Sequence, residues 1–122
     1  MKAFSLITDE ITAHEAEDDP RNQHILIYVD GKIVPRSEAK VSVYDSGFLL
    51  GDGVWEGLRF YNGTWAFLDE HINRLYEAAK AIDLDINLNE VELIAALEKT
   101  RLANRITKDA VSYTHLTLPT KA

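Results

Sequence analysis

The sequence predicts an α+β domain in which a mostly antiparallel sheet with hairpins packs against two helices. Three observations carry this prediction. Asp-Gly and Asn-Gly pairs separate short runs rich in β-branched and aromatic residues, which is typical of hairpins. These runs end near residue 68, and two segments with apolar residues at helical spacing follow. The length of 122 residues fits one domain with one hydrophobic core.

A first hairpin is predicted from the start of the apolar runs. His24–Val29 is β-branched and aromatic and indicates a strand. Asp30-Gly31 favours a two-residue turn, because both central positions of such turns need a positive φ. Lys32–Val34 returns as a short strand that Pro35 ends. The alternation in Lys40–Tyr44 predicts a third strand.

A second hairpin is built around the longest predicted strand. Asp45–Gly47 indicates a turn, and Gly51–Gly53 a flexible point before the strand. Val54–Tyr61 is the strand itself, Asn62-Gly63 its turn, and Thr64–Leu68 the returning strand.

Two helices complete the domain. Asp69 is a favourable N-cap for the first helix. Its predicted core face is Ile72, Leu75, Tyr76, Ala79 and Ile82. Asn89, with Glu92 three residues later, indicates a capping box for a second helix that ends near Asn104. The predicted apolar positions of that helix are Val91, Ile94, Ala95, Leu97 and Leu102.

Composition excludes several classes of function. The chain has no cysteine, so it forms no disulfide scaffold and has no cysteine nucleophile. Its net charge of -7 disfavours nucleic-acid binding. The four histidines are scattered, so no metal site is predicted. No apolar run is long enough to span a membrane, and a cytoplasmic location is expected. Residues 1–23 are predicted to be an acidic N-terminal arm, either a solvated leader or a segment that covers a site or a partner.

The long predicted strand carries the strongest candidate for a binding site. With a period of two, Trp55, Gly57, Arg59 and Tyr61 share one face, and Val54, Glu56, Leu58 and Phe60 share the other. The second face is mainly core. An arginine between two aromatic residues can bind an anionic, partly apolar ligand. The alternative interpretation is an arginine–aromatic stack on a solvated sheet face or at an interface.

Arg74, on the first predicted helix, is the second candidate. It lies beside the apolar face of that helix, where a fixed cation suits a phosphate group. The alternative is a simple ion pair with the neighbouring Glu70 or Glu77. On the first interpretation Arg74 shares a concavity with Trp55 and Arg59.

Two motifs in order resemble one enzyme family. The run Asp45-Ser-Gly-Phe-Leu-Leu-Gly-Asp-Gly-Val-Trp-Glu-Gly-Leu-Arg-Phe-Tyr-Asn-Gly63, followed by Phe67-Leu-Asp-Glu-His-Ile-Asn-Arg-Leu75, is similar to the class IV aminotransferases. These are the fold-type IV pyridoxal-phosphate enzymes, which include D-amino-acid, branched-chain and (R)-amine transaminases. The resemblance covers about residues 25–110 and corresponds to the small N-terminal domain only. Residues 24–110 are therefore predicted to be a transaminase-like small domain.

The resemblance implies a role for each matching residue. Arg74 would hold the phosphate of pyridoxal phosphate. Trp55 would line the substrate pocket, Glu56 would support the site from the strand, and Arg59 would lie near the substrate side. Leu50 occupies a pocket position that is often aromatic in relatives, so the substrate range stays open.

The resemblance also implies that a catalytic residue is missing. The lysine that forms the Schiff base belongs to the second domain of such enzymes, and none of the seven lysines here matches it. The implied reaction moves an amino group from an amino acid or amine to a 2-oxo acid. A truncated, non-catalytic domain that forms homo-oligomers and a simple anion-binding module are the alternatives. Residues 111–122 break from the family pattern and are predicted to be a non-native tail, the alternative being an ordinary last strand.

Overall fold

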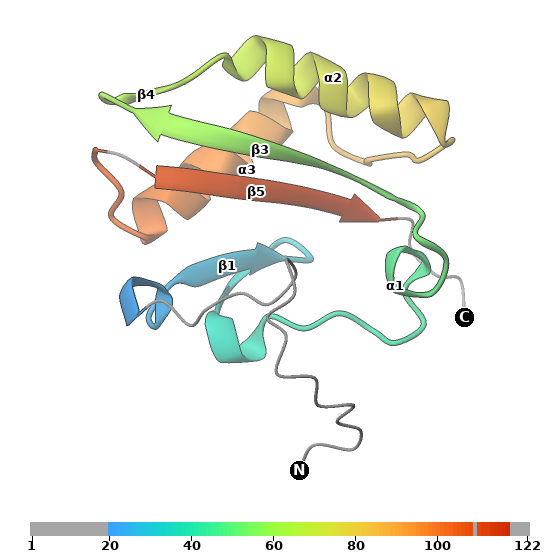
Figure 1. Ribbon diagram of the computed structural model, residues 1–122, viewed down its shortest axis with the longest axis horizontal. Coiled ribbons are helices and arrows are strands. Elements are labelled where there is room, and N and C mark those ends of the chain that lie inside the picture. Colours follow the sequence, from blue (N-terminus) through green and yellow to red (C-terminus); the bar gives the residue numbers. More distant parts are fainter. Residues whose placement is uncertain (1–19, 109, 118–122) are drawn as a thin grey trace, which may run out of the picture.

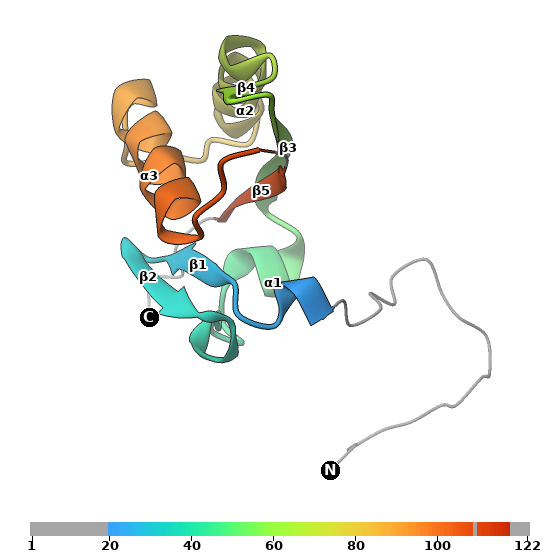
Figure 2. The same cartoon turned by 90° about the vertical axis from the view of Figure 1, so that its left-hand side faces the viewer.

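The structure is a computed structural model that describes residues 20–108 and 110–117. Its elements confirm the predicted α+β fold: small antiparallel sheets combine with helices. Most of the predicted arm and the last residues of the predicted tail lie outside the described residues. Figures 1 and 2 show the two longest helices on one side of a three-stranded sheet, with a separate hairpin beside them.

The first hairpin forms as predicted. Strands β1 (Leu26–Val29) and β2 (Lys32–Pro35) pair antiparallel, with Val29 opposite Lys32. Asp30 and Gly31 both have a positive φ, as a tight two-residue turn requires. The 3-10 turns η1 (Pro20–Asn22) and η2 (Arg36–Glu38) flank the hairpin.

The strand predicted at Lys40–Tyr44 is wrong. No strand lies there, and the amides of Tyr44 and Asp45 instead donate to the Ser42 hydroxyl and carbonyl, at 3.1 and 3.0 Å. This local turn provides the backbone hydrogen bonds that a partner strand would otherwise supply. The predicted turn at Asp45–Gly47 is instead the start of a short helix, α1 (Ser46–Leu50). Asp45 caps α1 by accepting from the Gly47 amide at 2.8 Å, and Gly51 ends it in the left-handed conformation.

The long strand lies at the centre of the larger sheet. Strand β3 (Gly53–Tyr61) pairs with β4 (Thr64–Trp65) on one side and with β5 (Ala110–Thr117) on the other, both antiparallel. The returning strand is therefore shorter than the predicted Thr64–Leu68. The strand β5 matches the alternative expectation for this segment. A strand does not bear on the origin of the residues, so the non-native tail stays a prediction.

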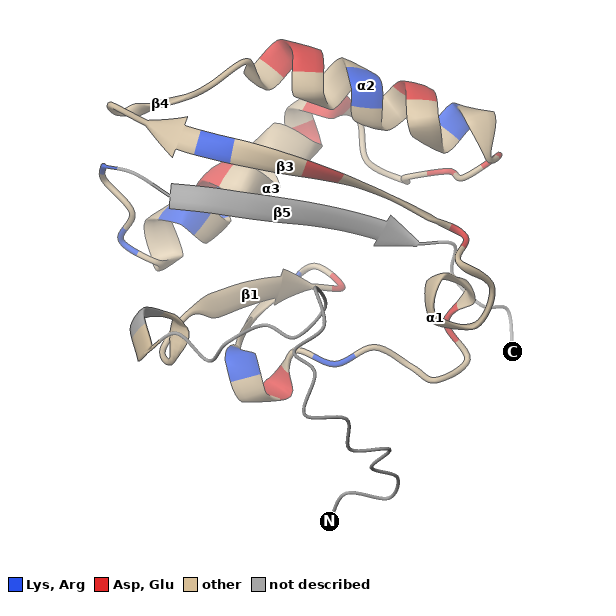
Figure 3. Ribbon diagram, viewed as in Figure 1, with Lys and Arg blue, Asp and Glu red and all other residues tan. Residues whose placement is uncertain are grey.

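The helices cover one face of this sheet. Helix α2 (Leu68–Ala81) begins one residue before Asp69, because Phe67 takes a left-handed conformation and its carbonyl accepts from the His71 amide at 3.0 Å. The predicted N-cap at Asp69 is therefore wrong. Helix α3 (Glu90–Ala103) begins with the predicted capping box between Asn89 and Glu92. Figure 3 shows acidic and basic residues interspersed along α2.

The core lies between β3 and the two helices. The buried cluster consists of Leu58, Ile72, Leu75, Leu93 and Leu97. Each such side chain stabilises the fold by about 1.5–3 kcal/mol relative to its exposed state. The predicted apolar face of α3 is partly wrong: Leu93 is buried, whereas Val91 and Leu102 are 76% and 62% exposed. Helix α3 is apolar on two sides, and sequence spacing alone could not tell which side faces the core.

Candidate functional site

A buried carboxylate lies among the apolar side chains of β3. Alternation along the strand turns Glu56 toward the helices together with Leu58 and Phe60, and Glu56 is only 6% exposed. It is the one charged residue that is buried among the described residues. A buried carboxylate destabilises a fold unless it is paired and hydrogen-bonded. Glu56 therefore needs a cation, and α2 supplies it.

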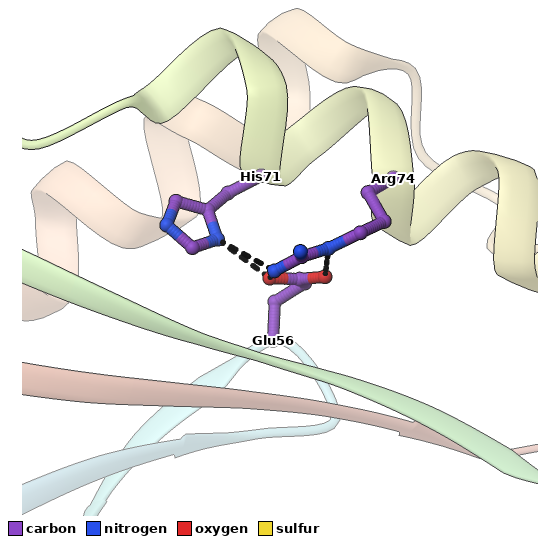
Figure 4. Close-up of polar contacts among 3 residues, drawn as sticks. All are labelled: Glu56, His71 and Arg74. Carbon is purple, nitrogen blue, oxygen red and sulfur yellow. Dashed lines mark hydrogen bonds and ion pairs between the residues drawn. The ribbon is translucent and has the colours of Figure 1, made fainter.

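Arg74 binds this carboxylate with two hydrogen bonds. Its Nε donates to Oε1 of Glu56 at 2.5 Å, and its Nη2 donates to Oε2 at 2.7 Å. The ring of His71 approaches from one helical turn earlier, with Nδ1 2.6 Å from Oε2. Figure 4 shows the two α2 side chains converging on Glu56 from above. Paired N–H groups that match the two carboxylate oxygens form one of the strongest ion-pair geometries in proteins.

Local sequence explains why these groups meet. His71 and Arg74 are three residues apart, so they project from the same side of α2. The buried Ile72 and Leu75 hold that helix on the sheet. The predicted alternative, an ion pair of Arg74 with Glu70 or Glu77, is wrong because the partner comes from β3 and not from α2.

Electrostatics keeps the pair fully ionised. The hydrogen bonds from Arg74 hold the pKa of Glu56 at about 2, below its ordinary 4.5; burial acts in the opposite direction, and the His71 contact adds to the lowering. The carboxylate in turn raises the pKa of Arg74 through its hydrogen bonds. The arginine is thus a permanent cation with a fixed orientation.

The outer edge of Arg74 faces solvent. The side chain is 67% exposed, although Glu56 holds its inner edge. Within the described part of the chain, its Nη1 has no hydrogen-bond partner. Because a guanidinium offers five N–H groups, the exposed edge can bind an anion while the inner edge stays on the carboxylate.

The other predicted site residues lie elsewhere. Trp55 and Arg59 project to the opposite face of β3, which no described helix covers in Figure 2. Trp55 is 61% exposed, and the Arg59 guanidinium lies 5.0 Å from the centroid of the Tyr61 ring. This is the arginine–aromatic stack that the sequence left as the alternative. Leu50, at the end of α1, is 74% exposed.

The described residues do not place Arg74, Trp55 and Arg59 in one cleft. The strand β3 separates the first side chain from the other two. Two surface depressions, of about 560 and 520 Å³, lie beside the β1–β2 hairpin and at the end of α2, and neither is lined by these residues. Over residues 20–108 and 110–117, no three histidine or acidic side chains are grouped to hold a metal ion. No helix in these ranges is long and apolar enough to cross a bilayer.

Sequence reasoning missed the link between the strand and the helix. It placed Glu56 on the core face and Arg74 beside the helix face, but it did not pair them. The available signal was an acid at an apolar position of a strand, since such an acid needs a buried partner. His71 entered only as part of a motif.

A small α+β domain with an arginine fixed against its sheet fits the aminotransferase class of proteins, and comparison with known proteins agrees. The family model for amino-transferase class IV matches residues 53–116, just over half of the 122 residues. The chain belongs to the class IV aminotransferase family. The resemblance drawn from the two motifs is thereby confirmed.

Individual relatives agree in sequence and in fold. A putative branched-chain-amino-acid aminotransferase of Methanocaldococcus jannaschii is 48% identical over 80 residues, which are 66% of this chain and 28% of that protein. A D-alanine aminotransferase of Bacillus licheniformis is 42% identical over 73 residues, 60% of this chain and 26% of that protein. A branched-chain amino acid aminotransferase from T.th., solved with N-(5'-phosphopyridoxyl)-L-glutamate, superposes with a TM-score of 0.73 at 29% identity, covering 81% of this chain and 34% of that one.

The chain therefore spans about a quarter to a third of the length of these relatives. The matched part is the part described above, with its sheet, its two long helices and the ion pair between them.

Proposed function

We propose that this chain is the small domain of a pyridoxal-phosphate-dependent aminotransferase, and that Arg74 binds the phosphate group of the cofactor. One observation carries the proposal: the guanidinium is clamped on Glu56 by its inner edge and presents its outer edge to solvent. A rigid, permanently charged fork matches the geometry of a phosphate. The relative solved with a phosphopyridoxyl ligand supports the choice of cofactor.

The residues present fit a phosphate in their chemistry. Arg74 supplies donors of the right type and sign. Glu56 does not compete for the exposed edge, because both of its oxygens accept from the inner edge. Glu56 is therefore a positioning residue that supports the site from the strand, the role expected for it.

When bound, pyridoxal phosphate supplies the electron sink for moving an amino group from an amino acid or amine to a 2-oxo acid. This chain would contribute binding and orientation. Arg74 would fix the phosphate end. Trp55, Arg59 and Leu50 would face the substrate: Arg59 would bind a carboxylate, and the apolar side chains would exclude water. These three side chains are exposed, as surfaces that further protein would cover in the longer relatives.

The chain by itself is proposed to lack turnover. None of its lysines matches the lysine of the family, and amino-group transfer needs that group to hold the cofactor and to move a proton. The proposed division is an arm at 1–23, a domain at 24–110 and a non-native tail at 111–122. A cytoplasmic location is part of the same proposal.

The phosphate assignment is tested by titrating the chain with pyridoxamine phosphate, which has no aldehyde and so does not react with lysines. Amide and Arg74 Nε–H signals are followed by NMR. Arg74→Ala should weaken binding about tenfold or more, the loss expected when a charged hydrogen-bond partner is removed. The matched control is Lys80→Ala, which removes the same charge from an exposed position on the same helix.

The control should bind as the parent chain does, and inorganic phosphate should compete for the site. Binding that is insensitive to Arg74→Ala would refute the assignment, and so would equal losses in the two variants.

A second candidate function, self-association, is favoured by exposed apolar side chains. Five of them lie at 65–74% exposure in the segment that leads into β3. They are Val41, Val43, Tyr44, Phe48 and Leu50. Exposed apolar groups of this density promote association, so we propose a homo-oligomer. Sedimentation over a hundredfold concentration range tests this, and a monomer throughout would contradict it.

A further inference from the structure

We propose that His71 is a positioning residue: its Nδ1–H fixes the Glu56 carboxylate, which then fixes Arg74. This inference deepens the proposed function and rests on it for its relevance to the cofactor. The relevant contacts are short. His71 Nδ1 lies 2.6 Å from Oε2 of Glu56 and 3.3 Å from Nη2 of Arg74.

The chemistry of the two neighbours assigns the proton. An ionised carboxylate only accepts hydrogen bonds, and a guanidinium only donates them. Nδ1 can satisfy the nearer group, Oε2, only if it carries a hydrogen. The longer contact with Nη2 then joins two donors and is a packing contact, not a hydrogen bond. The structure thus assigns a proton to Nδ1.

The proton on Nδ1 completes the hydrogen bonding of the buried carboxylate. Oε1 accepts from Arg74 Nε, whereas Oε2 accepts from both Arg74 Nη2 and His71 Nδ1. Without the imidazole, only Arg74 would hold the carboxylate, and its side chain is 67% exposed. The His71 side chain is 22% exposed and therefore less free to move. The histidine is the fixed member of the three.

The orientation of Arg74 follows from this order. The carboxylate defines the plane in which the two N–H groups of the inner edge bind, so it also sets where the outer edge points. If Oε2 lost its second donor, Glu56 could rotate and Arg74 could swing away with it. A phosphate would then meet a mobile cation in place of a preorganised fork.

Two substitutions separate hydrogen bonding from packing. His71→Asn keeps an N–H the same number of bonds from Cα as Nδ1 is, whereas His71→Leu keeps comparable bulk without a donor. The readout is hydrogen exchange of the Arg74 Nε–H in the intact chain. We expect exchange about tenfold faster in His71→Leu, and near the parent rate in His71→Asn. Nitrogen NMR of the parent chain should also show hydrogen on Nδ1.

The comparison excludes a purely structural role. Asn is a poorer helix former than Leu, so a general effect on α2 would make His71→Asn the worse variant. Rescue by Asn is therefore specific for the hydrogen bond. His71→Ala serves as a second donor-less variant and should also speed exchange. Unchanged exchange in the donor-less variants would overturn the inference, as would failed rescue by Asn or a parent imidazole without hydrogen on Nδ1.

The same samples distinguish this inference from the proposed function. Exchange that follows the expected order, with no pyridoxamine phosphate binding at Arg74, would refute the phosphate assignment and keep the positioning role. Binding that needs Arg74, with exchange indifferent to His71, would do the reverse.

Discussion

Replacing Glu56 by Gln is expected to destabilise the chain and to flatten its response to acid. Glutamine keeps the shape of the side chain, but it turns one acceptor into an NH₂ group that faces the donors of Arg74 and His71. A buried donor is then left unpaired. This loss falls on the contact that joins β3 to α2.

The structure gives the size of the effect. The pKa of Glu56 falls from 4.5 to about 2 because of the hydrogen bonds from Arg74. Each pKa unit corresponds to about 1.4 kcal/mol, which sets an upper bound of about 3 kcal/mol. Solvent screens the exposed arginine, so about 1–2 kcal/mol is the expected loss at pH 7. For a domain of this size, that lowers the midpoint of thermal unfolding by about 5–10 °C.

The acid response has a definite sign. Because the pKa of Glu56 is lower in the folded chain, its stabilisation is complete above about pH 5 and is lost as the pH falls toward 2. The difference in midpoint between Glu56→Gln and the parent chain should therefore shrink over that range. Thermal unfolding followed by circular dichroism at several pH values measures it. The control is Glu70→Gln, at an exposed carboxylate on α2.

Equal midpoints for Glu56→Gln and the parent chain at pH 7 would refute the reasoning. So would a pH-independent difference between them, or an equal loss in Glu70→Gln.

Two further predictions concern the frame of the site. Asn104→Ala should loosen the β1–β2 hairpin, because the Asn104 amide accepts from Leu26 N at 2.7 Å and donates to Leu26 O at 2.9 Å; the Leu26 amide should exchange faster while β3 amides do not change, and uniform exchange would count against it. Asn89→Ala should cost about 1 kcal/mol by removing the capping box of α3. Chemical denaturation measures that loss, and an unchanged midpoint would contradict it.

Local signals in the sequence predicted much of the fold. Asp30-Gly31 and Asn62-Gly63 lie at positive φ, as turn chemistry requires. The capping box at Asn89 and Glu92 set the start of α3 to the residue. Alternation along β3 placed Leu58 on the buried face. Each of these features depends on residues a few positions apart, and such features are visible in a sequence.

Features that depend on distant partners were not predictable in this way. Lys40–Tyr44 alternates like a strand, but among the described residues no strand pairs with it. Leu93 was missed because α3 is apolar on two sides and only tertiary packing chooses between them. The partner of Arg74 lies 18 residues away, on another element. Family resemblance named Arg74 and Glu56, whereas only the coordinates joined them.

The charges of the cluster define what this domain contributes to an anion site. Glu56 and Arg74 carry opposite fixed charges, so their sum nearly cancels at a distance. A phosphate dianion near them gains little from long-range attraction and depends on short, directed hydrogen bonds to the outer guanidinium edge. Affinity in the isolated chain should therefore be weak and only modestly sensitive to salt. Strong salt dependence would instead indicate diffuse binding to surface cations. The buried carboxylate reduces charge in exchange for direction, which is the property that a cofactor site needs when further protein supplies the remaining donors.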